Sequence, residues 1–151
     1  MAMTMNGQVQ LPAKREVVWE KLNDPEVLKS CIPGSEQLDR ISENEFQAVA
    51  TMKVGPVKAR WKGKVRLTDL DPPNSYRISG EGEGGVAGFA KGGAKVSLTD
   101  NNGGTLLTYD VEAQIGGKLA QLGQRLINSA AKKTADDFFA KFVVAVGTGG
   151  S

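Results

Sequence analysis

The sequence contains no histidine and a single cysteine, Cys31, among its 151 residues. Without histidine, neither a Ser-His-Asp triad nor a Cys-His pair can form. The commonest ligand of zinc and non-haem iron is missing for the same reason. The acidic residues show no clustered pattern of the EF-hand type, and one cysteine cannot form a disulfide within the chain. We therefore expect no metal site and no triad-based hydrolysis.

Long apolar runs and a strong net charge are also missing. The last apolar run, residues 142–146, is too short to span a bilayer, and the N-terminus lacks the features of a signal peptide. The 19 basic and 17 acidic residues give a net charge of +2, which argues against a nucleic-acid partner. We predict one domain over residues 1–146, and a flexible tail or cloning remnant at residues 147–151.

Hydrophobic periodicity predicts the order of the secondary structure. Alternation with a period of two predicts six to seven strands, at residues 4–11, 36–42, 46–54, 57–67, 76–83, 90–98 and 105–114. Pro12 and Pro25 open two short helices after the first strand, and Asp24 is the expected N-cap of the second. After Gly116 the period changes to 3.6, which predicts an amphipathic helix of about 29 residues that includes Gly123. A curved antiparallel sheet must bury its apolar face on that helix, so we expect an α+β fold.

The residues predicted to face inward include no charged side chain, and about half of those on the middle strands are glycine or alanine. Such a face either lets the helix approach closely or leaves a cavity, and the strand pattern alone fits both equally well. Gly123 has the same two interpretations, close approach to a ligand or plain helix–sheet packing. The candidate cavity residues are Phe46, Ala48, Ala50, Met52, Ala59, Trp61, Gly63, Tyr76, Ile78, Gly80, Gly82, Ala94, Val96, Tyr109, Val111, Leu119, Leu122, Gly123 and Leu126.

Two further patterns occur on the middle strands. Residues 80–85 match GxGxxG, but they open no helix and carry two glutamates where a pyrophosphate would lie, so we reject a dinucleotide site. A basic ladder occupies one outer strand face and consists of Lys58, Arg60, Lys62, Lys64 and Arg66. The ladder is either a docking patch for anionic lipid or an acidic partner, or it pairs across strands with Glu81 and Glu83.

Catalysis finds little support in the sequence. General acid–base catalysis needs a titratable group inside the pocket, and the inward face offers only tyrosines. Cys31 has no histidine to activate it, so we interpret it as a small buried hydrophobic residue at a helix end. In this interpretation Pro33 and Gly34 end the short helix and start the next strand, and Cys31 and Ile32 shape one rim of the cavity.

Five segments, in a fixed order, form a specific pattern: VVWEKLNDPEVLKSCIPGSEQL, MKVGPVKARWKGKVRL, YRISGEGEG, GFAKGGAKVSL and GGKLAQLGQRLI. This ordered set resembles the CoxG-like family, named after the CoxG subunit of carbon monoxide dehydrogenase, over residues 3–143. The resemblance implies the helix-grip fold of the START-like (SRPBCC) superfamily, in which a curved antiparallel sheet wraps around a long C-terminal helix. It also implies an apolar cavity between the two, which favours the cavity over the packed core.

The resemblance implies a role as well as a fold. Family members are non-enzymatic accessory proteins of aerobic molybdenum-containing CO dehydrogenases and related hydroxylases. The implied role is to bind a respiratory isoprenoid quinone, such as menaquinone, or another lipid, and to link the enzyme to the cytoplasmic membrane in electron transport. The expected location is cytoplasmic, peripheral to the inner face of the membrane, with attachment through a C-terminal tail absent from these 151 residues.

The residues suggest where a quinone ring would bind, and they are compatible with two other functions. We expect a flat quinone ring to stack on Trp61, Tyr76 or Phe46. The first alternative is an assembly or docking factor for the hydroxylase that carries no ligand and contacts it through the basic ladder. The second is a small-molecule enzyme, because a fold does not fix a function.

Overall fold

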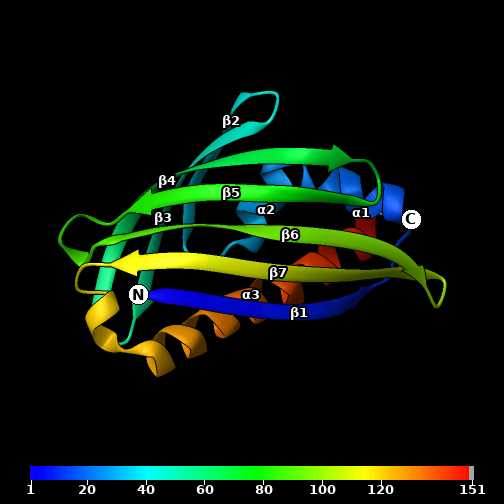
Figure 1. The fold of residues 1–151 in the computed structure, drawn as a ribbon. Helices are drawn as coiled ribbons and strands as arrows, with labels where there is room; N and C mark the ends of the chain where they lie inside the picture. The colour runs from blue at the N-terminus through cyan, green and yellow to red at the C-terminus, as the bar shows by residue number, and fades with distance from the viewer. Residues whose placement is uncertain (150–151) are drawn as a thin grey trace.

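The computed structural model describes residues 1–149, which form a seven-stranded antiparallel sheet wrapped around one long helix (Figure 1). The strands are β1 (Ala2–Leu11), β2 (Ser35–Ser42), β3 (Glu45–Val54), β4 (Val57–Asp71), β5 (Ser75–Glu83), β6 (Phe89–Asn101) and β7 (Gly104–Gly116). The helices are α1 (Arg15–Leu22), α2 (Pro25–Cys31) and α3 (Gln124–Gly149), with 3₁₀ turns η1 (Gly85–Ala87) and η2 (Ala120–Leu122). The predicted α+β helix-grip fold is confirmed.

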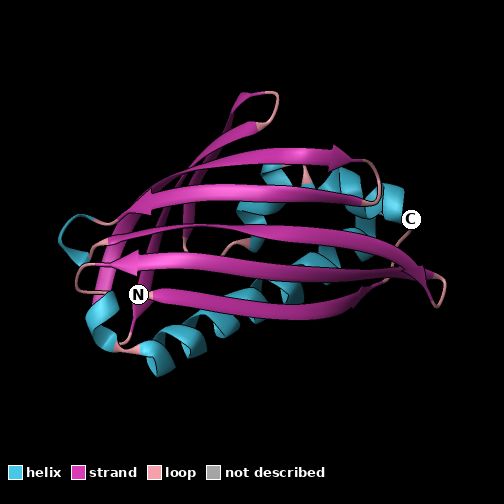
Figure 2. Cartoon of the chain, viewed as in Figure 1, coloured by secondary structure: helices cyan, strands magenta, loops and turns pink. Residues whose placement is uncertain are grey.

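The sheet has the strand order β1-β7-β6-β5-β4-β3-β2. The segment with α1 and α2 connects β1 at one edge to β2 at the other, and α3 runs beneath the concave face (Figures 1 and 2). All pairings are antiparallel, with register shifts in β2–β3 and near the end of β4–β5. Where the register is regular, alternate residues of a strand face α3. Within residues 1–149, no helix combines the length and the apolar character needed to cross a membrane.

The start of α3 differs from the prediction. The helix begins at Gln124, and Gly123 precedes it with a φ of +92°. Gly117, with a φ of +81°, and the turn η2 complete the connection from β7. Because a left-handed φ interrupts a helix and suits glycine, the prediction that Gly123 lies inside the long helix is wrong. Of the predicted tail, residues 147–149 belong to α3, and residues 150–151 lie outside the described residues.

The segment around Cys31 joins a helix to a strand, as predicted. Asp24 caps α2 by accepting a hydrogen bond from the Glu26 N–H at 3.0 Å. The helix ends at Cys31, which is 1% exposed and is therefore a buried hydrophobic residue. Gly34 follows with a φ of +74°, and a Cβ atom there would collide with the carbonyl oxygen of Thr51. Glycine at this position lets the chain turn sharply into β2.

The apolar core is divided into two clusters along α3. The larger cluster lies where α1, α2 and the C-terminal half of α3 meet the sheet, and it includes Leu11, Val18, Leu98, Leu107, Phe142 and Val146. The smaller cluster lies near the start of α3 and consists of Met3, Ile115, Leu119 and Ile127. The core is therefore not continuous from one end of the helix to the other.

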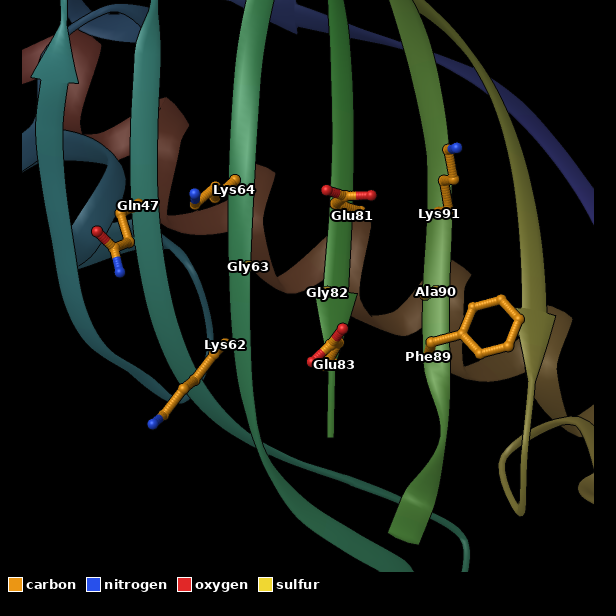
Figure 3. Close-up of a pocket in the computed structure, with 10 residues that line it drawn as sticks. All are labelled: Gln47, Lys62, Gly63, Lys64, Glu81, Gly82, Glu83, Phe89, Ala90 and Lys91. Carbon is orange, nitrogen blue, oxygen red and sulfur yellow. The ribbon is translucent and has the colours of Figure 1, made fainter. Parts of the chain in front are cut away.

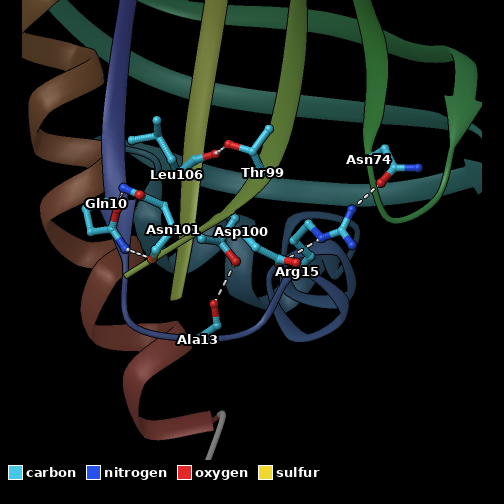
Figure 4. A network of polar contacts seen from close by, with 9 residues as sticks. Gln10, Ala13, Arg15, Asn74, Thr99, Asp100, Asn101 and Leu106 are labelled. Atoms are coloured by element: carbon cyan, nitrogen blue, oxygen red, sulfur yellow. Dashed lines mark hydrogen bonds and ion pairs between the residues drawn. The ribbon is translucent and has the colours of Figure 1, made fainter. Parts of the chain in front are cut away.

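Polar contacts hold α1 and the neighbouring hairpins together at the larger cluster (Figure 4). Gln10 of β1 and Asn101 of β6 exchange two hydrogen bonds of 2.8 Å. Arg15 of α1 pairs with Asp100 at 2.9 Å and donates a hydrogen bond to Asn74 in the β4–β5 turn. These contacts cross between segments that are distant in sequence, so they help to fix the position of α1 against the sheet.

Tyr76 makes the larger cluster sensitive to alkaline pH. Its ring is 4% exposed and packs edge-on against Trp19, and burial raises the pKa of its hydroxyl. The stability from burying the neutral hydroxyl is present below the pKa of the unfolded chain, about 10, and is lost as the pH rises above it. In a Tyr109→Phe variant, Tyr76 is the sole tyrosine, so we expect tyrosinate absorbance to rise only together with unfolding by circular dichroism. Ionisation of a still-folded chain would contradict this expectation.

Candidate functional site: an apolar cavity beneath the long helix

A cavity of about 580 Å³ lies between the concave face of the sheet and the helix α3. It occupies the space between the two core clusters, and side chains packed on each cluster form its walls. The lining residues are Met3, Met5, Ile32, Pro33, Met52, Val54, Trp61, Ile78, Ala90, Ala94, Val96, Tyr109, Val111, Ala113, Ile115, Leu119, Ile127, Ala130, Ala131, Thr134, Ala135, Phe138 and Phe139.

The lining is almost entirely apolar. None of its side chains is charged, and only Trp61, Tyr109 and Thr134 carry an N–H or O–H group. The Thr134 hydroxyl donates a hydrogen bond of 2.9 Å to the carbonyl oxygen of Ala130, one turn earlier in α3. Its proton is therefore not available to a ligand in the cavity. An apolar chamber with a few polar groups is the usual composition of a small-molecule site. The walls offer no carboxylate, lysine or thiol for acid–base or nucleophilic chemistry.

Tyr109 connects the cavity to the protein surface. Its ring lines the cavity and stacks on Phe139, with 5.4 Å between the centroids and 20° between the planes. Opposite it on β1 is Gly7, where a Cβ atom would lie 2.5 Å from the Tyr109 hydroxyl oxygen. Gly7 therefore leaves room for the hydroxyl, which forms no hydrogen bond within residues 1–149. The sequence had predicted Tyr109 as one of the few polar groups of the site.

A groove of about 480 Å³ runs between β1 and α3 beside this hydroxyl, and we call it the polar mouth. Its walls include Tyr109 from β7 and Asn128, Lys132 and Asp136 from α3. Lys132 donates a hydrogen bond of 2.8 Å to Asp136, which together with the attraction of that carboxylate raises the pKa of Lys132. The polar mouth thus places hydrogen-bonding and charged groups next to the end of an apolar chamber.

A second groove, of about 390 Å³, lies on the opposite side of α3, between the helix and β3. Five residues line both this groove and the cavity, namely Pro33, Met52, Val54, Ala130 and Thr134. Most of these shared residues are apolar, in contrast to the polar mouth. The cavity is therefore bordered by surface grooves along both sides of the helix.

Ion pairs neutralise part of the basic ladder on the outer face of β4. Arg60 lies 3.2 Å from Glu36 of β2, and Arg66 lies 3.3 Å from Glu45 of β3. The hydrogen bond from Thr51, and then the nearby Arg60, lower the pKa of the Glu36 carboxyl. These pairs are exposed and contribute little stability, but they remove two cations from any free basic surface.

Two lysines of the ladder also face acidic residues. In the register of β4 and β5, Lys62 lies opposite Glu83 and Lys64 lies opposite Glu81. Figure 3 shows these side chains around an outer pocket that has small residues between the charged rows, namely Gly63, Gly82 and Ala90. Lys62 and Lys64 therefore have the acidic cross-strand neighbours that the second interpretation of the ladder named. The ion pairs of Arg60 and Arg66 with Glu36 and Glu45 were not predicted.

A known protein family matches most of the chain. Residues 7–147 match the family model for the CoxG subunit of carbon monoxide dehydrogenase. The chain belongs to the CoxG family. The crystal structure of a conserved protein from Geobacillus kaustophilus is 35% identical to this CoxG-family domain, with a TM-score of 0.91 over 97% of this chain and 96% of that chain. No curated protein matches the sequence.

More distant structures share the fold of the CoxG-family domain. A START superfamily protein from Mycobacterium smegmatis is 12% identical, with a TM-score of 0.73 over 96% of this chain and 97% of that chain. The Zhui aromatase/cyclase from Streptomyces sp. R1128 is 10% identical, with a TM-score of 0.70 over 97% of this chain and 94% of that chain. At these identities the likeness establishes the START-like fold alone, since related folds carry different activities.

The CoxG-family domain brings eight of the nineteen predicted residues to the cavity, namely Met52, Trp61, Ile78, Ala94, Val96, Tyr109, Val111 and Leu119. Phe46 and Tyr76 face the same side of the sheet but are buried in the larger core cluster. Leu126 is 37% exposed and lines the groove between α3 and β3 rather than the cavity. The remaining eight lie outside the lining: Ala48, Ala50, Ala59, Gly63, Gly80, Gly82, Leu122 and Gly123. Strand parity identified the correct face, but it could not say how far along each strand the cavity extends.

Sequence reasoning missed most of the α3 wall. The helix contributes Ile127, Ala130, Ala131, Thr134, Ala135, Phe138 and Phe139. These positions are spaced by three or four residues and so share one face of the helix. The three alanines among them were the available signal, because small residues on a helix that faces a glycine- and alanine-rich sheet leave space. Among residues 1–149, no group of three or more histidine, cysteine, aspartate or glutamate side chains is placed to hold a metal ion.

Proposed function

We propose that this domain is a carrier for a hydrophobic small molecule, a respiratory quinone, and serves as an accessory protein of a molybdenum-containing CO dehydrogenase. The observation that carries the proposal is the 580 Å³ cavity with an uncharged lining and one free tyrosine hydroxyl at its edge. Membership of the CoxG family supports the choice of partner enzyme. In this role the domain would link the enzyme to the quinone pool of the membrane.

The chemistry of the lining suits a quinone in two ways. Trp61 and the stacked pair Tyr109 and Phe139 offer aromatic faces to a flat ring. The Tyr109 hydroxyl can donate a hydrogen bond to a quinone carbonyl oxygen, and the alanine, valine and methionine walls suit an isoprenoid tail. Tyr76 and Phe46, which the sequence had suggested for ring stacking, are packed in the core, so the proposal assigns the ring to Trp61 and Tyr109.

The residues of the cavity would bind and shield the quinone rather than transform it. A quinone accepts electrons and protons from its enzyme partner, and this lining contains no charged group to assist that transfer. Its apolar walls instead exclude water from the ring and the tail. The alternative of a docking factor without cargo rests on the basic ladder, most of which lies beside acidic neighbours, so no observation favours it over the carrier.

The test is direct detection of the cargo. We expect an organic extract of the purified protein to contain about one isoprenoid quinone per chain by mass spectrometry, and the emptied protein to bind added short-chain menaquinone saturably. Trp61 lines the cavity, whereas Trp19 packs on the larger cluster against Tyr76. Menaquinone should therefore quench tryptophan fluorescence strongly in a Trp19→Phe variant and much less in a Trp61→Phe variant. A quinone-free extract together with no saturable quenching would refute the carrier and favour the docking factor.

A further inference from the structure

One end of the molecule is built from three connecting segments that lie together, and we call it the tip. The segments are residues 53–58 between β3 and β4, residues 83–89 around η1, and residues 116–126 around η2 (Figure 1). The N–H of Leu119 donates to the carbonyl oxygen of Ala87 at 2.9 Å, which joins η2 to η1. A Cβ atom on Gly55 would lie 2.8 Å from Leu126, so the β3–β4 hairpin contacts the start of α3. The three segments therefore form one continuous surface.

The tip exposes apolar side chains to solvent. Val86 in η1 is 83% exposed, Phe89 is 49% exposed and Leu126 is 37% exposed. Val86 is the middle residue of η1, in the connection between β5 and β6. An exposed valine and a half-exposed phenylalanine are what a surface that enters the interfacial layer of a membrane presents.

The charges of the tip are predominantly positive. Its segments contain four cations, Lys53, Lys58, Lys118 and Arg125, and one anion, Glu83. Lys53 and Lys58 lie opposite each other in the register of β3 and β4, so the part of the basic ladder that lacks an acidic cross-strand neighbour belongs to the tip. An anionic leaflet attracts basic groups held close to its surface.

The turns at the other ends of the same strands carry the opposite charge. Residues 42–45, 69–74 and 99–104 contain five carboxylates and no cation. Three of these carboxylates, Glu45, Asp69 and Asp100, pair with arginines, and the other two are Glu43 and Asp71. After this pairing, two carboxylates remain at this end without an arginine partner, whereas the tip has an excess of cations. The difference favours the tip as the end that faces an anionic surface.

The tip also adjoins the cavity. Val54 and Leu119 belong to the tip segments and line the cavity. A Cβ atom on Gly84 would lie 2.9 Å from the ring of Trp61, so the η1 segment rests on a cavity wall. A surface that touched the tip would therefore lie against the end of the cavity.

We propose that the tip docks on a membrane surface rich in anionic phospholipid, with Val86 and Phe89 entering the headgroup region and the surrounding cations contacting phosphates. This inference rests on the membrane-linking part of the proposed function and adds the face of the domain that makes the contact. It places the cavity at the lipid surface without requiring any other segment of the chain.

The test measures sedimentation of the whole chain with vesicles of phosphatidylcholine, with and without equimolar phosphatidylglycerol. We expect binding to the anionic vesicles that weakens with salt, and at least tenfold weaker binding for Val86→Glu/Phe89→Glu. Each basic residue near an anionic surface tightens binding about fivefold, so Lys118→Glu/Arg125→Glu should also weaken it by more than tenfold. The matched control is Ile41→Glu/Leu70→Glu, which changes exposed apolar residues at the opposite strand ends and should bind like the unaltered chain.

Three results would overturn the proposal. They are equal binding to neutral and anionic vesicles, undiminished binding of the tip variants, and no vesicle binding at all. If the tip variants instead lost their complex with CO dehydrogenase, the tip would be a protein interface. Quinone quenching of the tip variants in solution separates this inference from the carrier function, because those variants should still bind menaquinone. Tip-dependent vesicle binding by a chain that binds no quinone would support the docking surface and refute the carrier.

Discussion

Replacing Ala135 with phenylalanine is expected to weaken quinone binding strongly while the domain stays folded. Ala135 lies on α3 and lines the cavity, so the larger side chain would occupy the space that the proposal assigns to the ligand. We expect the affinity for short-chain menaquinone to fall by on the order of a hundredfold, because an overfilled pocket must strain to admit the ligand. Tryptophan quenching measures the affinity, and circular dichroism measures the fold.

The same helix and the facing sheet provide the controls. Ala140 is exposed on α3, so Ala140→Phe should bind menaquinone with unchanged affinity. Ala94 lines the cavity from β6, between Ile78 and Val111 in the register of the sheet, so Ala94→Phe should reproduce the loss from the opposite wall. Full affinity in both cavity variants would show that the ligand binds elsewhere.

Replacing Phe142 with alanine is expected to lower the free energy of unfolding by about 3–5 kcal/mol. Phe142 is fully buried in the larger core cluster and stacks on Phe138 with 5.6 Å between the ring centroids. Removing the ring leaves a void among side chains that α1, the sheet and α3 hold in place. Urea unfolding followed by circular dichroism would measure the loss as a lower midpoint at an unchanged slope.

Phe139 is the matched control for Phe142. Its ring packs edge-on against Phe138 and Phe142, but it also lines the cavity and is only partly buried. Because part of its surface already borders open space, Phe139→Ala should cost clearly less stability than Phe142→Ala. It should weaken menaquinone binding as well, since it removes the ring stacked on Tyr109. Equal losses of stability in the two variants would contradict the division of the core into a packed part and a cavity.

The sequence was sufficient for the fold because its signals are local and consistent. Strict alternation from Val57 onward predicted β4, and Asp24 marked the start of α2. The start of α3 was harder to predict from the sequence, because residues 118–122 continue an apolar pattern that is compatible with a helix. Only the left-handed φ values of Gly117 and Gly123 separate these residues from the helix. The sequence alone does not show which φ a glycine adopts.

The site was predicted in outline but not in detail. Trp61, Ala94 and Tyr109 were identified because inward parity on a strand is readable, and each lines the cavity. Tyr76 shares that parity but fills the core, since the position of α1 and α2 along the sheet decides which inward residues are covered. That position depends on tertiary contacts between distant segments, which periodicity does not encode.

The break between the two core clusters has a consequence for the lifetime of the protein in a cell. A ligand that binds the folded chain stabilises it by mass action, by about 2.7 kcal/mol at a concentration one hundred times its Kd. The cargo would complete the packing between the clusters, so an occupied domain would open less often than a vacant one. Proteolysis that follows such opening selects the vacant form. The abundance of the carrier would then follow the supply of its own cargo.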